Sequence, residues 1–445
     1  MKFQYLITLI YFFQGARGYI GTLMSIYFKE TLKLDPSTSG IIKTIAKQPW
    51  NWKVAYGVLF DCKPYTKRFM IFSCALILFG LVLLLLTSVH GSVFMIGLGL
   101  LIINFGGAFS DVIGDGEMVR ITQKAPDGDS LNAYLQSISW TAYGVGGIFG
   151  TLLGGSVVKW FGPTGYFILL IPFPVLLVLL TLSYDQVPAY PSSLKLFGNK
   201  LVQVFQALKQ PRVLKPLIFV FIQNATGIGI GEGMTYFRIS IGMDAQILGF
   251  ADTFAYLGLI LGSVLFNKYF SKVPIDKIMI ATTIISSVVS LLDLVQLRRW
   301  NVAVGISDFL FLIGYDVVGE VIGRLNLMPL MILAAKFCPD SIEATMFATI
   351  MSIFNLTSDV GSLLGSWLLS LYNINESHYE GMDRLIMLRA VLGLVPLLFI
   401  KYLKEYDYEL VKDEPGIPLE PVGNIASKPT TPEGLESPRK RHVIY

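Results

Sequence analysis

The chain has 445 residues, of which 53% are hydrophobic and only 15% are charged. Soluble proteins usually carry ~25% charged residues, so this composition excludes an ordinary soluble globular protein. The net charge of +4 needs no nucleic-acid partner to explain it. The three cysteines are odd in number and widely spaced, which argues against a disulfide framework or a cysteine-based metal site. We therefore expect a membrane protein without a metal or another cofactor.

Uncharged runs of membrane-spanning length recur along the chain. A helix needs ~20 apolar residues to cross ~30 Å of hydrocarbon. Hydropathy predicts an all-α membrane protein with twelve transmembrane helices. These lie near residues 5–28, 37–60, 69–89, 93–122, 130–158, 163–184, 213–236, 244–269, 275–297, 302–336, 341–371 and 383–403. The first run contains Arg17 and merges into a span, so we expect a membrane helix there and not a cleaved signal.

Two polar segments divide the chain. Residues 185–212 contain prolines and lysines, and we expect a cytoplasmic linker with a surface helix there. Residues 405–445 are rich in proline, serine and charge. Such a segment cannot bury enough apolar area to offset its ordering entropy, so a disordered cytoplasmic tail is expected. The remaining residues form an N-terminal half (1–184) and a C-terminal half (213–404).

The distribution of lysine and arginine predicts the orientation. If the N terminus is inside, the inner loops hold most of these residues and the outer loops few. The positive-inside rule then places both termini in the cytosol. Asn375, in the sequence Asn375-Glu376-Ser377, falls in the last outer loop as a candidate glycosylation site. No targeting signal is legible, so the plasma membrane is the default and an organellar membrane stays open.

The chain also repeats itself. DSLNAYLQSISWTAYGVGGIFGTLLGG at 129–155 aligns without gaps to DSIEATMFATIMSIFNLTSDVGSLLGS at 340–366. This pairs the fifth span with the eleventh and predicts two six-helix halves. Two such parallel halves are the arrangement of the major facilitator fold. In that fold the first, fourth, seventh and tenth spans face a central cavity, and here these spans hold most of the charges at membrane depth.

Carboxylates in the fourth and tenth spans are candidate site residues. Asp111 and Asp115 are four residues apart and share one helix face. A charge at membrane depth costs at least ~2.5 kcal/mol on insertion scales, so it normally faces a bundle interior or a watery cavity. We interpret both, with Asp316, as candidates for proton or substrate coupling; a static charge-paired lock between spans is the alternative. Glu320 is a further candidate and is expected to form an internal ion pair with Arg324.

Cations in the first two spans are the second set of candidates. Arg17 lies near the middle of the first span, with Gln14 on the same face. A guanidinium suits a substrate carboxylate, and the alternative is a structural counter-ion for the acids of the fourth and tenth spans. Lys47 and Lys43 share a face of the second span and can draw an anion inward. For Lys43 we favour snorkelling to the outer headgroups.

The loop between the second and third spans is a candidate gate. Gly57 and Asp61, followed by Lys67 and Arg68, resemble the loop of major facilitators at this place. An acid there accepts hydrogen bonds from a helix N-terminus, and the bases pair with acids across an inner gate. Arg120, at the inner end of the fourth span, is grouped with them. A plain basic loop that sets the topology is the alternative.

Several motifs together resemble the folate–biopterin transporter family, a branch of the major facilitator superfamily. They are YFFQGARGYIG at 11–21, QPWNWKVAYGVLFD at 48–61, SDVIGD at 110–115, and a set of GISD, MP, AAKFCP, EAT and MSIFN between 305 and 355. The resemblance covers the chain up to about residue 403. The chain departs from the family pattern at Arg120, where the family tends to have Glu.

The resemblance implies a secondary active transporter of folates or pterins that works by alternating access, with proton coupling expected. Its partners would be a small organic solute, protons and the lipid bilayer, with no nucleic acid; a monomer and no enzymatic activity are expected. Arg17 and Lys47 favour an anionic pteroylglutamate, because its carboxylates need cations, whereas the cavity acids favour a cation. A carrier of another organic ion, such as S-adenosylmethionine, and a non-transporting membrane sensor on the same scaffold are the alternatives.

Overall fold

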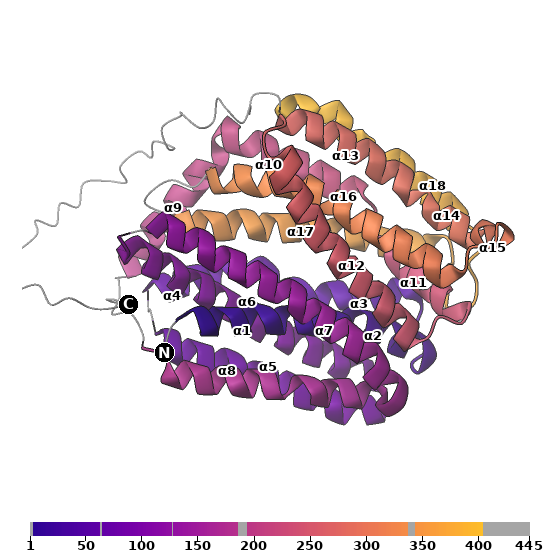
Figure 1. Ribbon diagram of the computed structural model, residues 1–445, viewed down its shortest axis with the longest axis horizontal. Helices are drawn as coiled ribbons and strands as arrows, with labels where there is room; N and C mark the ends of the chain where they lie inside the picture. Colours follow the sequence, from indigo (N-terminus) through magenta and orange to yellow (C-terminus); the bar gives the residue numbers. More distant parts are fainter. Residues whose placement is uncertain (1–2, 63–64, 127, 186–193, 337–342, 404–445) are drawn as a thin grey trace, which may run out of the picture.

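The computed structural model describes residues 3–62, 65–126, 128–185, 194–336 and 343–403 of the chain. Most of its helices run side by side along the long axis of the molecule (Figure 1). In chain order the elements are α1 (Phe3–Ala16), η1 (Arg17–Tyr19), α2 (Ile20–Glu30), α3 (Pro36–Lys47), η2 (Gln48–Trp52), α4 (Lys53–Cys62), α5 (Thr66–His90), α6 (Val93–Lys124), α7 (Gly128–Leu170), α8 (Pro172–Ser183), α9 (Leu194–Lys209), α10 (Pro211–Thr226), α11 (Gly231–Ser240), α12 (Ala245–Leu265), η3 (Phe266–Phe270), α13 (Ile275–Ser290), α14 (Leu292–Leu297), α15 (Trp300–Ala303), α16 (Asp308–Lys336), α17 (Glu343–Leu371), α18 (Met382–Leu392) and η4 (Val395–Tyr402).

The predicted twelve-helix membrane fold is confirmed. Among the described residues, nine segments are long and apolar enough to cross a membrane, and one of them, Tyr134–Ser183, has 50 residues. That segment turns back at Gly162, whose φ of 67° lies in the left-handed region that favours glycine, so it supplies two crossings (Figure 1). The first two crossings are α1–α2 and α3–α4. Each contains a short 3₁₀ segment and charged residues, which lowers its hydropathy.

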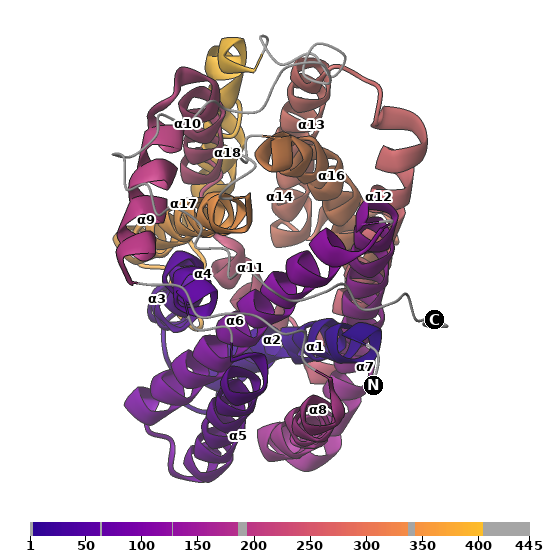
Figure 2. The same cartoon turned by 90° about the vertical axis from the view of Figure 1, so that its left-hand side faces the viewer.

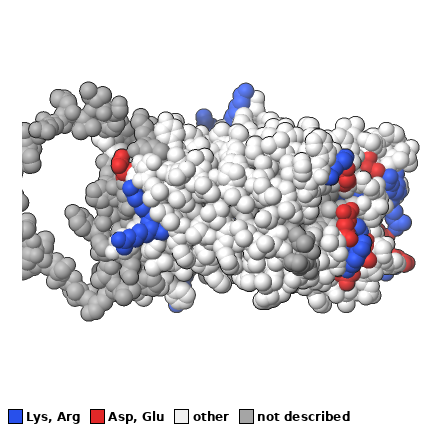
Figure 3. All heavy atoms as spheres, turned by 90° about the horizontal axis from the view of Figure 1, so that it is seen from below, with Lys and Arg blue, Asp and Glu red and all other residues white. Residues whose placement is uncertain are grey.

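The two ends of the bundle are distinct from its middle. We call the end that holds the N terminus and α9 the terminal end, and the opposite end, which holds α15, the far end (Figure 1). On the face drawn in Figure 3, acidic and basic side chains gather mainly toward these two ends, and the band between them is largely uncharged. Such a band is what a hydrocarbon environment requires, because exposed charges are costly there.

Two groups of helices face each other across the molecule. Seen from the terminal end, α1, α5, α6 and α8 lie on one side, and α10, α13, α16 and α18 lie on the other (Figure 2). A helix, α9, lies within the predicted linker segment, between α10 and α4. The division at residues 184 and 213 remains a prediction, and the tail at 405–445 lies outside the described residues. We call the two groups the first half and the second half.

Small residues bring the helices of the first half into close contact. A Cβ atom at Gly146 or at Gly150 on α7 would overlap the main-chain carbonyl of Phe12 or of Ala16 on α1. Without side chains at these positions, the two backbones approach one another directly, as is common between membrane helices. This contact fixes the first span against the fifth, and with it the position of Arg17 and of the polar side chains on α1.

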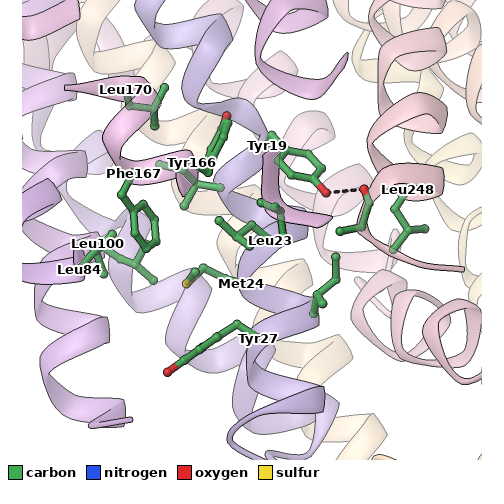
Figure 4. Packing of buried hydrophobic residues seen from close by; sticks show 14 of the residues in the cluster. Tyr19, Leu23, Met24, Tyr27, Leu84, Leu100, Tyr166, Phe167, Leu170 and Leu248 are labelled. Carbon is green, nitrogen blue, oxygen red and sulfur yellow. Dashed lines mark hydrogen bonds between the residues drawn. The ribbon is translucent and has the colours of Figure 1, made fainter. Parts of the chain in front are cut away.

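Aromatic residues complete the core where the halves meet. Tyr19 and Tyr166 are fully buried, and their rings meet edge to face with centroids 5.4 Å apart. The Tyr19 hydroxyl donates a hydrogen bond of 2.6 Å to the carbonyl of Ala245 on α12, in the second half (Figure 4). Leu248, also on α12, packs into the same cluster. The core is therefore continuous from one half to the other.

Candidate functional site

The fourth span, α6, carries a polar cluster that faces α1 and α4. The Asp111 carboxylate is 4% exposed and accepts a hydrogen bond of 2.9 Å from the Gln14 side chain. Its second oxygen forms an ion pair of 2.6 Å with Lys53 at the start of α4. A buried carboxylate is stable when it is both paired and hydrogen-bonded. Asp111 therefore has the charge-paired setting that the sequence left open as one alternative.

Asp115 lies one turn further along α6 in a different setting. Its carboxylate accepts a hydrogen bond of 2.8 Å from the Tyr11 hydroxyl on α1. Within the described part of the chain, no cation forms an ion pair with it. The two acids predicted as a pair thus share a helix face but differ in partners, since one has a cation and the other has a neutral phenol.

Arg17 lies beside this cluster and has no acidic partner in the part of the chain that the structure describes. Its guanidinium donates a hydrogen bond of 3.2 Å to the Asn104 side chain and lies 5.1 Å from the centre of the Trp50 ring. Its buried Nε atom has no hydrogen-bond partner among the described residues. In the same residues it forms no ion pair with the acids of the fourth or tenth span, contrary to the counter-ion alternative. A guanidinium held by an amide and an aromatic face keeps its charge uncompensated.

Trp50 holds these cations in place. Its ring is close to both Arg17 and Lys53, and the Lys53 ammonium is 4.9 Å from the ring centre. The indole nitrogen donates a hydrogen bond of 2.9 Å to Asn104, which fixes the ring on α6. The opposite side of the η2 segment faces the second half, where Asn355 on α17 donates to the Trp50 carbonyl at 3.3 Å. The QPW motif is therefore at the junction of both halves.

Lys43 is not a snorkelling residue, and that prediction was wrong. Its ammonium forms an ion pair of 2.7 Å with Glu232 on α11 and donates a hydrogen bond of 2.7 Å to Ser25 on α2. The Ser39 hydroxyl donates to the same Glu232 carboxylate at 2.5 Å. Glu232 belongs to the second half, so this ion pair joins the two halves. A buried lysine is stabilised by such a carboxylate, and it does not have to extend to the headgroups.

Lys47 follows Lys43 by one turn on the same face of α3. One turn beyond it, Asn51 donates a hydrogen bond of 2.7 Å to Asp359 on α17, and Gln48 donates to the same carboxylate at 2.8 Å. Residues on both sides of Lys47 therefore reach the second half. Its own exposed side chain makes neither a hydrogen bond nor an ion pair with any residue that the structure describes. Lys47 thus places a free ammonium on the face between the halves.

A cavity of about 320 Å³ opens between α2, α11, α12 and α16. Its polar wall contains Thr22, Thr235, Arg238, Asp252, Tyr315, Asp316 and Glu320. Thr22 donates a hydrogen bond of 2.6 Å to Asp252, so one acid is tied to the first half. Asp316 and Glu320 form neither hydrogen bonds nor ion pairs with the described residues. The structure therefore brings Asp316 and Glu320 together in a cavity, at a distance from Asp111 and Asp115 on α6.

The predicted ion pair between Glu320 and Arg324 is not formed within the described structure. The Arg324 guanidinium instead lies 5.7 Å from the centre of the Trp140 ring on α7. Glu320 turns into the cavity, where solvent reaches it. Residues four apart on a helix can pair, but a neighbouring aromatic face and an open cavity offer each side chain another environment.

Arg238 lies inside the bundle, on α11, although the seventh span was predicted to end near residue 236. It forms an ion pair of 3.0 Å with Asp293, and Arg389 forms a second pair with the same carboxylate at 3.1 Å. The Tyr315 hydroxyl donates to Asp293 at 3.0 Å. Asp293 and Arg389 come from α14 and α18, so this pair joins the predicted ninth and twelfth spans. Because Arg238 and Tyr315 line the cavity, this network fixes two residues of the cavity wall.

The predicted gate residues make their contacts inside the first half. Arg120 lies 3.5 Å from Glu117, donates a hydrogen bond of 3.1 Å to the Phe60 carbonyl and covers the Phe60 ring. Lys67 donates to the Leu182 carbonyl at 3.2 Å, and exposed Arg68 lies over the Tyr65 ring. The side chain of Asp61 is outside the described residues. A gating role for these residues remains a prediction.

Polar contacts join the halves at the far end. Lys159 forms an ion pair of 2.9 Å with Asp244. Lys29 donates a hydrogen bond of 2.7 Å to the Tyr379 hydroxyl and also reaches the Glu376 carbonyl. Burial raises the pKa of Tyr379 to about 12, so this phenol stays neutral and donates to the Glu376 carbonyl at 2.8 Å. The same loop carries Asn375, whose side-chain oxygen caps the following turn.

Comparison with solved structures defines the class. The chain superposes on an auto-inhibited peptide transporter of the POT family with a TM-score of 0.69 at 14% identity, covering 91% of this chain and 97% of that one. At this identity the likeness establishes the fold alone. The molecule thus has the fold of the major facilitator transporters, as the internal repeat predicted.

Sequence comparison defines the family. The BT1 family model matches residues 14–415. The chain is 31% identical to the probable folate-biopterin transporter 4 of Arabidopsis thaliana, over 90% of this chain and 95% of that protein. It is 30% identical to the folate-biopterin transporter of Synechocystis, over 91% and 82% of the two chains. The chain therefore belongs to the BT1 family of folate–biopterin transporters and is not an enzyme.

Proposed function

We propose that this protein is a secondary active transporter that carries folates or pterins by alternating access. The observation that carries the proposal is uncompensated charge inside the bundle: among the described residues, Arg17 and Lys47 have no acidic partner, and Asp316 has no cationic one. Unpaired charges at membrane depth are expensive, so they are retained where a solute can compensate them. The names of the relatives point to folates and pterins as that solute.

We further propose that proton coupling uses Asp115. Asp111 is tied to Lys53, so taking up a proton there would leave the ammonium unpaired. Asp115 is hydrogen-bonded to the neutral Tyr11 hydroxyl, which can donate to a carboxylate or accept from a carboxylic acid. A proton can therefore bind and leave Asp115 without breaking an ion pair. A change in the charge of Asp115 would affect Asp111, one turn away on α6, and through it the ion pair with Lys53.

The alternating-access cycle would require the contacts of the far end to open. Lys159 with Asp244 is an ion pair that crosses the halves there, and Lys43 with Glu232 is a second one, between α3 and α11. An exposed pair such as Lys159 with Asp244 contributes little, but a largely buried pair such as Lys43 with Glu232 contributes more and would exchange partners during opening. Under this proposal the protein is a monomer with both termini in the cytosol, and the far end with Asn375 faces the opposite side of a plasma or organellar membrane.

The test is uptake of labelled folic acid into proteoliposomes with and without an inward proton gradient. We expect the gradient to stimulate uptake and Asp115→Asn to abolish the stimulation. Exposed Glu380→Gln is the matched control, because that carboxylate is 86% exposed at the far end. Gradient-independent uptake in the unmodified protein would contradict proton coupling, and absence of folate uptake would contradict the proposed solute.

A cationic solute is the competing candidate, favoured by the carboxylates Asp252, Asp316 and Glu320 around the cavity. Biopterin and S-adenosylmethionine are therefore added as competitors in the same assay. Competition by biopterin but not by S-adenosylmethionine is expected. The reverse result would keep the carrier and replace its substrate.

A further inference from the structure

Charged side chains that have no oppositely charged partner among the described residues occur in both halves. Two of the cations, Arg17 and Lys47, belong to η1 and α3 of the first half, and two of the acids, Asp316 and Glu320, line the cavity from α16 of the second half. We call the first group the basic pole and the second, together with Asp252, the acidic pole. We infer that the two poles bind opposite ends of one substrate, so that the acidic pole receives the pteridine ring and the basic pole receives the glutamate carboxylates. This inference rests on the proposed function.

The acidic pole has the size and chemistry of a ring site. Its volume of about 320 Å³ is at the lower limit of small-molecule pockets, so it suits one fused bicyclic ring better than a whole pteroylglutamate. A pterin ring presents two neighbouring N–H donors, on N3 and on the exocyclic 2-amino group. A carboxylate accepts two parallel hydrogen bonds of this kind. Asp316 is available for them because it has no partner among the described residues.

Neighbouring residues give the ring its walls. Leu248, Ala251, Ala255 and Leu312 line the same cavity with apolar surface. Thr22 donates a hydrogen bond to Asp252, and Arg238 is paired with Asp293. Among the described residues, the cavity carboxylates without a hydrogen-bond or ion-pair partner are therefore Asp316 and Glu320. This arrangement suits an aromatic heterocycle. Its apolar faces contact apolar side chains, and its polar edge keeps hydrogen bonds to a carboxylate.

The basic pole can reach the same ligand. Arg17 precedes the cavity residue Thr22 by five residues on the first span, a rise of ~7.5 Å in helical geometry. Ser25, one turn beyond Thr22, bonds Lys43, and Lys47 follows Lys43 by one turn. The first span therefore carries residues of both poles, and the hydrogen bond between Ser25 and Lys43 links it to α3. A pteroylglutamate separates its pterin donors and its carboxylates by a benzoyl linker, so it can bridge them.

The test uses fragments that carry one end each. Biopterin contains the pterin ring without glutamate, and p-aminobenzoylglutamate contains the carboxylates without the pterin. Their binding to the full-length protein in nanodiscs is measured by calorimetry for the unmodified chain, Asp316→Asn and Lys47→Gln. We expect Asp316→Asn to weaken biopterin about tenfold or more and to spare p-aminobenzoylglutamate, and Lys47→Gln to do the converse. Folic acid should weaken in both variants.

The fragment that each variant still binds shows that the variant is folded. Glu380→Gln and Lys33→Gln, which change exposed charges, are the matched controls and should bind both fragments normally. If either pole variant weakens both fragments equally, or the pattern is reversed, the assignment of poles is overturned while the proposed function stands. If the unmodified protein binds neither folic acid nor biopterin, the proposed function itself fails.

Discussion

Asp111 and Asp115 lie one turn apart on α6, yet their partners give them different tasks. Asp111 is buried and paired with Lys53 at 2.6 Å, and Asp115 accepts from Tyr11. Removing one partner of a buried ion pair leaves the other charge buried and uncompensated. Removing both partners eliminates the desolvation cost together with the attraction between the charges. We therefore expect the Asp111–Lys53 pair to stabilise the fold. Because Asp115 lies one turn away on α6, a change in its protonation can affect this pair.

Asp111→Asn should lower the free energy of unfolding by about 3 kcal/mol, because it leaves the Lys53 ammonium unpaired in the bundle. The double variant Asp111→Asn with Lys53→Gln should recover most of the loss. Thermal unfolding of the detergent-purified variants measures both effects. Equal melting temperatures for Asp111→Asn and the unmodified protein would show that the ion pair contributes nothing.

The sequence indicates which side chains are charged at depth but not which of them meet. The partners of Lys53 and Lys43 could not be predicted, because Asp111 and Glu232 are 58 and 189 residues away in sequence. Such pairs depend on how the spans pack against one another. The pairing of Asp293 with Arg389 was not visible either, because their predicted spans also contain Asp276, Lys277, Asp383, Arg384 and Lys401. Arg238 joined them only once the seventh span was seen to extend to Ser240.

At the scale of elements, the contact between α1 and α7 positions the polar cluster. It depends on glycines that no apolar pattern reveals, although the repeat containing them was visible in the sequence. The twelve spans were predictable because long apolar runs have few other solutions. The breaks at η1 and η2 were not, since they place Arg17 and Trp50 by local geometry within otherwise helical stretches.

Gly150→Ala should destabilise the protein by about 1–3 kcal/mol, because the new methyl group overlaps the Ala16 carbonyl. Gly21→Ala is the matched control, since open space surrounds a Cβ there, and it should be neutral or slightly stabilising. Size-exclusion chromatography before and after heating compares the folded fractions. Similar behaviour of the two variants would contradict the close helix contact.

At the scale of the molecule, the halves meet along α7 and α12. The hydroxyls of Thr151 and Thr253 lie 2.8 Å apart, one from each half. Cysteines at both positions, in a background with Cys62, Cys74 and Cys338 replaced by alanine, should form a disulfide, because the side chains are within bonding reach. Oxidation should stop transport, reduction should restore it, and the single variants should be unaffected. Undiminished transport by the oxidised protein would show that the halves need not separate here.

We propose that this chain moves a folate across a membrane by exposing one site to each side in turn. Counterflow tests it most directly: proteoliposomes preloaded with unlabelled folic acid are diluted into labelled folic acid without an ion gradient. We expect transient accumulation of label that depends on the preload and is lost when the cysteines of the Thr151→Cys, Thr253→Cys variant are oxidised to a disulfide. Binding of folic acid without any exchange would contradict it and favour a membrane sensor.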